Sequence, residues 1–132
     1  MNRYADRRAN AVAIVASDAL LAALIGAAVE LYGYRAEFPR GDETPVDTLR
    51  RVRPTYLLVD ADDPRAADET LLGRARMSGA RLFVFGTAEA TQRIQPVASR
   101  YDVLSIVLPR DLDALPQILT RRGDATESRV RD

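Results

Sequence analysis

The sequence predicts a single α/β domain in which helices cover both faces of a parallel β-sheet. Short apolar runs recur along the chain without the alternation of a half-exposed strand, and stretches with helical spacing follow them. The connections are short, which favours right-handed crossovers between parallel strands. A chain of 132 residues suits one domain with a substantial core.

Five apolar runs are predicted as strands. They cover residues 11–16, 36–38, 56–60, 81–86 and 103–108. The second run has the weakest signal. The third ends at Asp60, and the carboxyl ends of parallel strands form the rim of the sheet where ligands bind. Asp62 and Asp63 follow and add negative charge there.

Capping residues mark the first two helices. Ser17 or Asp18 is expected to cap the first helix, which Gly33 ends. Thr44 is expected to cap the second, with Pro45 in its first position. The arginines at the C-terminal end of this second helix suit the helix dipole and are interpreted as structural; they are Arg50, Arg51 and Arg53.

Aspartate caps and a proline are used to predict the remaining helices. One helix is predicted over residues 64–78, with Asp63 as its cap and with Ala67, Leu71, Leu72 and Ala75 facing the core. Pro96 is expected to break the helical pattern of residues 89–101. Asp113 is expected to cap the last helix. The polar residues 1–9 and 123–132 are predicted to be disordered tails around a domain at 10–122.

A predicted strand is followed by a predicted helix five times along the chain. This order predicts a flavodoxin-like, doubly wound (βα)5 sheet with strand order 2-1-3-4-5. The switch point of that order lies between the first and third strands. It brings the turn at Ser17 and Asp18 beside Asp60.

Composition excludes several kinds of chemistry. The chain lacks cysteine, histidine, tryptophan and lysine, which removes thiol, Ser/His/Asp and Schiff-base chemistry and any His/Cys zinc site. With 19 basic and 19 acidic residues the net charge is zero, so neither nucleic acid nor an anionic membrane is an expected partner. The absence of cysteine fits a reducing compartment, and we expect a cytoplasmic location.

The apolar N-terminal third is predicted to be a strand and a helix rather than a membrane span. Asp18 lies at its centre, and a central Asp costs about 2.5–3.5 kcal/mol on insertion. The helix has no polar residue over positions 19–29. Its inward face is predicted as Leu21, Leu24, Ile25, Ala28, Val29 and Tyr32, and its outward face as Ala19, Ala22, Ala23, Gly26 and Ala27. The outward face either carries alanine for helix propensity or forms an interface.

Three segments resemble the receiver domains of bacterial response regulators. PTYLLVDADDP is similar to the family's third strand, FVFGTA to its fourth strand with a hydroxyl residue, and SIVLPRD to its fifth strand with a Lys-Pro pair. The resemblance spans about residues 10–122. It implies that Asp60 corresponds to the phospho-acceptor, Thr87 to the hydroxyl residue and Pro109 to the proline.

The sequence differs from this family mainly at the positions that carry the family's chemistry. Ala16 and Ser17 stand where the resemblance implies an acidic pair that holds Mg²⁺, Leu108 replaces the lysine, and Ser105 replaces the aromatic switch residue. We therefore expect no cofactor, with any Mg²⁺ held weakly, and no efficient phosphorylation of Asp60. The predicted pocket around it contains Ser17, Asp18, Asp62, Thr87, Leu108 and Pro109.

The leading hypothesis is a degenerate, pseudo-receiver signal-transduction module. It would have no output domain and no enzymatic activity, and would act by protein–protein interaction with a partner in trans or as a homodimer. The alternative is a functional phosphoacceptor response regulator of a two-component phosphorelay.

A weaker alternative is a haloacid-dehalogenase-like phosphatase, because LLVDAD matches a motif in which Asp60 would be the nucleophile and Asp62 the general acid/base. That motif belongs on an early strand in such enzymes. They also hold their metal with an acidic pair late in the chain, for which Asp111 and Asp113 are a poor match. A cobalamin domain would need a histidine ligand that the chain lacks. A flavin domain would need a phosphate loop after the first strand, and none is present.

Overall fold

The computed structural model describes residues 10–119 and contains a five-stranded, fully parallel sheet in the order β2-β1-β3-β4-β5. The strands are β1 (Ala11–Val15), β2 (Arg35–Glu37), β3 (Tyr56–Asp60), β4 (Arg81–Gly86) and β5 (Leu104–Val107). The predicted fold class and strand order are confirmed. The predicted tails at 1–9 and 123–132 lie outside the described residues, as does the predicted end of the domain at 122.

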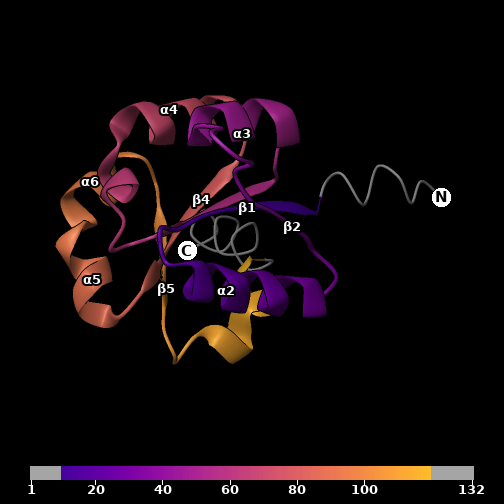
Figure 1. Cartoon of the computed structure of the whole chain (residues 1–132). Coiled ribbons are helices and arrows are strands. Elements are labelled where there is room, and N and C mark those ends of the chain that lie inside the picture. Colours follow the sequence, from indigo (N-terminus) through magenta and orange to yellow (C-terminus); the bar gives the residue numbers. More distant parts are fainter. Residues whose placement is uncertain (1–9, 120–132) are drawn as a thin grey trace, which may run out of the picture.

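Helices cover both faces of the sheet. They are α2 (Ala19–Leu31), α3 (Pro45–Val52), α4 (Glu69–Met77), α5 (Ala88–Arg93) and α6 (Gln95–Arg100), with 3₁₀ turns η1 (Pro64–Ala67) and η2 (Leu112–Ala114). Residues 115–119 are also helical. Figure 1 shows α3 and α4 on one side of the sheet and α2 on the other. None of these described helices combines the length and apolar composition needed to cross a bilayer.

The sheet divides the core into two apolar clusters, and successive residues of the central strands alternate between them. Leu57 and Val59 pack on the side of α3 and α4, whereas Leu58 packs on the side of α2. Every residue of β1 and β3 is buried. Burial on both faces explains why these strands read as continuous apolar runs in the sequence.

The helix predicted over residues 64–78 is divided in two. Asp63 caps η1, as predicted, but Asp68 then starts α4 by accepting hydrogen bonds from the backbone N–H groups of Thr70 and Leu71 at 3.0 and 3.3 Å. A 3₁₀ turn has a different phase from an α-helix. As a result Ala66 is buried and Ala67, predicted to face the core, is exposed.

The C-terminal half contains one confirmed and one wrong prediction. The helical pattern around Pro96 is broken into α5 and α6, as expected. The capping role predicted for Asp113 is wrong, because Asp113 lies inside η2. Asp111 holds this turn instead: its Oδ2 accepts a hydrogen bond from the backbone N–H of Val107 at 2.8 Å.

The predicted faces of α2 are wrong at four positions. Ala22 and Gly26, predicted to face outward, are buried. Leu24 and Tyr32, predicted to face inward, are 49% and 39% exposed. The cause lies beside β2: a Cβ added at Gly26 would lie 2.7 Å from the Phe38 ring and 3.6 Å from Ala36 Cβ. The small residues thus let this helix approach the chain around β2 closely.

Candidate functional site

Asp60 is the last residue of β3 and lies at the carboxyl rim of the sheet. It is 5% exposed, and β4 pairs with it through Phe85. Its Oδ1 accepts a hydrogen bond from the backbone N–H of Asp62 at 2.9 Å. Its carbonyl oxygen accepts another from Asp63 N–H at 2.9 Å, which closes a tight turn after the strand. The side chain is therefore held in place by its own turn.

The surroundings of Asp60 disfavour its charged form. Burial raises the pKa of this carboxyl, and the negative charges of Asp62, Asp63 and Asp18 raise it further, while the hydrogen bond from Asp62 N–H opposes the shift. None of the ion pairs between described residues includes Asp60. The group predicted as the phospho-acceptor thus has no partner cation in residues 10–119.

The cation at this rim binds Asp63 instead. Arg65 Nε donates to Asp63 Oδ1 at 2.9 Å and Arg65 Nη2 to Asp63 Oδ2 at 2.7 Å, a bidentate pair. Ser17 Oγ donates to the same Oδ2 at 2.7 Å, and the Asp63 side chain is only 1% exposed. The Arg65 bonds hold the pKa of Asp63 well below its usual range. This cluster fastens the loop after β1 to the loop after β3.

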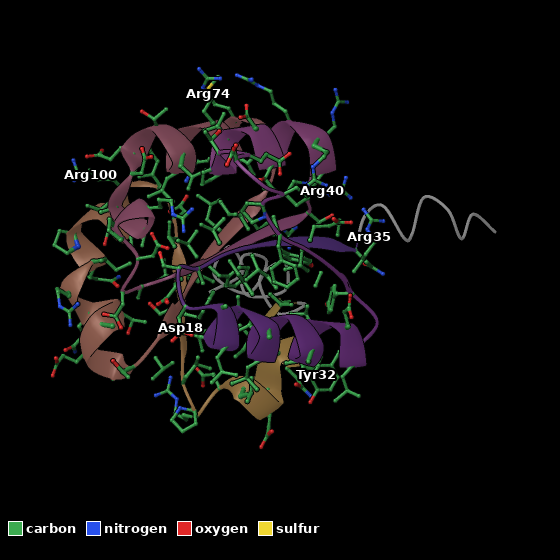
Figure 2. The ribbon with its side chains drawn as sticks, viewed as in Figure 1. Asp18, Tyr32, Arg35, Arg40, Arg74 and Arg100 are labelled. Carbon is green, nitrogen blue, oxygen red and sulfur yellow. The ribbon has the colours of Figure 1, made fainter. Side chains whose placement is uncertain are left out.

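The other predicted pocket residues mostly have structural contacts. Asp18 caps α2 through the N–H groups of Leu20 and Leu21, at the helix start visible in Figure 2. Thr87 caps α5 by accepting from Ala90 N–H at 3.1 Å. Exposed Asp62 pairs with Arg93 at 3.1 Å. Leu108 packs against the α2-side core, and Pro109 is exposed.

The residues present do not fit the Mg²⁺ site that the family resemblance implies. Mg²⁺ favours octahedral oxygen ligation with carboxylates supplied by the protein. Asp63 is occupied by Arg65 and Ser17, and Asp18 by the backbone of α2. Within residues 10–119, no three His, Cys, Asp or Glu side chains are grouped so as to hold a metal ion.

Sequence reasoning missed Arg65. Asp63 was interpreted as a helix cap, which it is, since its Oδ1 accepts from Arg65 N–H at 2.9 Å. Its second role needs the contact with Ser17, which is 46 residues away in the chain. The sequence contains one sign of the Asp63–Arg65 pair: Arg65 is the first basic residue after the acidic residues of this turn.

Comparisons with known proteins support the fold alone. The sequence matches no known protein family and no curated protein. A solved structure from Burkholderia pseudomallei K96243, of a protein provisionally described as pilus assembly-related, is similar in fold with a TM-score of 0.66. The two sequences are 19% identical, and the match covers 87% of this chain and 90% of that one.

Asp60→Asn is expected to leave the fold as stable or to stabilise it by up to about 1 kcal/mol at pH 7. Asparagine keeps an oxygen for the Asp62 N–H bond and removes a buried charge near three carboxylates. The gain should shrink as the pH falls, because the wild-type carboxyl, with its raised pKa, takes up a proton. Urea unfolding across pH 4–8 measures this. A clear loss of stability at pH 7 would contradict it.

Asp63→Asn is expected to destabilise the fold by about 1–2 kcal/mol at pH 7, because it weakens the charge-assisted bonds to Arg65. The pKa of this carboxyl is lowered by folding, so its contribution is complete above the unfolded value near pH ~4 and is lost below it. At pH 7 the same unfolding series should give a lower urea midpoint for Asp63→Asn than for the wild type, and an equal or higher midpoint for Asp60→Asn. An unchanged Asp63→Asn midpoint at pH 7 would show that the pair is not structural.

Proposed function

We propose that this chain is a receiver-like signalling module that works by contact with other proteins and not by phosphoryl transfer. The observation that carries the proposal is the state of Asp60: a buried carboxyl at the rim, with a raised pKa and no ion pair to any described residue. The sheet order and the position of Asp60 support the receiver-like part. The raised pKa of Asp60, and the lack of an ion pair between Asp60 and any described residue, support the loss of phosphoryl transfer.

Phosphorylation of Asp60 would need positive charge that this rim does not supply. Phosphoryl transfer is catalysed mainly by positioning and by cations placed against the phosphoryl oxygens. Asp60 instead has three carboxylates nearby. An acyl phosphate there would carry about two negative charges, in place of the single charge of the carboxylate. Arg65 is committed to Asp63, and Leu108 occupies the place of the family's lysine.

The outer face of α2 supports a role in protein contact. Leu20 and Leu31 are 81% and 78% exposed, and Leu24, Ala23 and Ala27 are exposed between them. Positions 20, 24, 27 and 31 follow the spacing of a helix–helix seam. No charged residue occurs in α2 before Glu30. Because small and leucine side chains alternate on this uncharged face, we take a second copy of the chain as its occupant.

The structural neighbour adds a weaker argument for protein contact. It is provisionally described as pilus assembly-related. Assembly of a pilus requires contacts between protein chains, so a similar role for this chain would favour a binding module over an enzyme.

Incubation with acetyl phosphate and Mg²⁺ is expected to leave the intact mass unchanged, because the described residues give Asp60 neither a metal site nor a counter-cation. Beryllofluoride should likewise cause no chemical-shift changes at the rim. Stable labelling that Asp60→Asn removes would restore phosphorelay signalling. Turnover of a generic phosphomonoester that requires Asp60 would instead indicate a phosphatase.

Ala23→Glu is expected to abolish self-association, because it places a charge at the centre of the outer face of α2 without entering the core. Sedimentation equilibrium of the full chain gives the oligomeric state. Ala67→Glu, also at an exposed alanine, is the matched control and should leave the dimer intact. A wild type that stays monomeric at high concentration would refute the homodimer, and a pull-down with and without Ala23→Glu would then test a partner in trans.

A further inference from the structure

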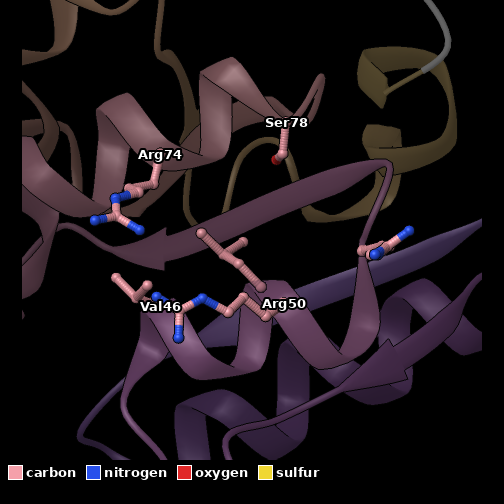
Figure 3. A pocket seen from close by; sticks show the side chains of 6 residues that line it. Val46, Arg50, Arg74 and Ser78 are labelled. Atoms are coloured by element: carbon pink, nitrogen blue, oxygen red, sulfur yellow. The ribbon is translucent and has the colours of Figure 1, made fainter.

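A pocket of about 500 Å³ lies between α3 and α4, away from the rim that contains Asp60. Val46 and Leu49 contribute apolar side chains, and Arg50, Arg53, Arg74 and Ser78 complete the lining. Figure 3 shows Arg74 extending from α4 toward α3, and Arg50 lying along α3, with both guanidinium groups at the Val46 end. The volume lies in the range of small-molecule sites.

The charges of this pocket are poorly balanced by the protein itself. Arg50 pairs with Asp47, at 3.4 Å and with both side chains exposed. The guanidinium groups of Arg53 and Arg74 have no carboxylate within 4.0 Å among residues 10–119. By contrast, neighbouring Arg51 is fully engaged by Glu43 at 2.7 and 2.9 Å. The pocket therefore contains two cations, Arg53 and Arg74, that have no anion beside them among the described residues.

The backbone at Arg53 gives a second, independent observation. Arg53 ends α3 in the left-handed conformation, with φ 50° and ψ 60°. Glycine is favoured at such a position because a Cβ is strained there. Cations at helix C-termini suit the helix dipole, but a dipole contact does not require an arginine at the strained residue itself. Strain of this kind is retained where a side chain is needed.

We propose that the pocket between α3 and α4 binds a small organic phosphate. Guanidinium groups bind phosphate oxygens bidentately, and the apolar side chains of Val46 and Leu49 suit the carbon part of such a ligand. The site is separate from Asp60 and from the outer face of α2, so this proposal does not rest on the proposed function. Free phosphates and lipid headgroups share the chemistry, and a volume of about 500 Å³ suits a free small molecule.

The test is titration of the ¹⁵N-labelled full chain with inorganic pyrophosphate, against sodium chloride at equal ionic strength, followed by amide shifts. Saturable shifts should be confined to the C-terminal turn of α3 and to α4. Arg74→Ala and Arg53→Gly should each weaken binding about tenfold, because each removes a charge-assisted contact. Arg53→Gly should not lower the melting temperature, since glycine relieves the left-handed strain.

Arg40→Ala is the matched control, because it removes one positive charge outside the pocket lining. It should leave the affinity unchanged. Equal weakening by Arg40→Ala would mean general charge attraction and would overturn the proposal, as would the absence of saturable shifts. A parallel arm measures sedimentation with phosphatidylglycerol vesicles: binding to vesicles without binding to pyrophosphate would identify a lipid surface and refute a free ligand.

Discussion

Strand β3 pairs with β1 along one edge and with β4 along the other, and both of its faces are covered. This double pairing fixes the position of Asp60, because Val59 lies opposite Val15 and Asp60 opposite Phe85. The loops after three strands therefore meet around one carboxyl that water scarcely reaches. Burial makes a charge there costly unless a cation offsets it. The balance between this cost and an offsetting cation determines the pKa shifts of the two buried carboxyl groups at the rim, Asp60 and Asp63.

The rim contains two aspartates, three residues apart, with opposite pKa shifts. Burial and neighbouring carboxylates raise the pKa of Asp60, whereas Arg65 lowers that of Asp63. Opposite shifts in adjacent carboxyls can mark an acid and a base in an enzyme. Here geometry favours another interpretation. The ionised Asp63 joins Ser17 to Arg65 and ties two loops together, so its shift reflects a structural contact, and Asp60 is left as an isolated buried group.

Local patterns predicted the strands and most of the caps, because burial on both faces and capping side chains act within a few residues. Asp18 and Thr44 cap their helices as expected. The faces of α2 were misassigned because Gly26 meets Phe38, which lies beyond β2 and leaves no trace in helical periodicity. The Asp63 cluster was missed for the same reason: its bond to Ser17 depends on the pairing of β1 with β3.

The two surfaces proposed for binding lie on opposite faces of the sheet, as the positions of α2 and of α3 with α4 in Figure 1 show. A ligand between α3 and α4 would not block a protein on the outer face of α2. Any effect of one on the other would have to pass through the sheet, and β1 is the strand on which both α2 and α3 pack. Because β1 is buried throughout and paired on both edges, it resists deformation. The geometry therefore favours two independent binding events on a rigid scaffold over a switch between conformations.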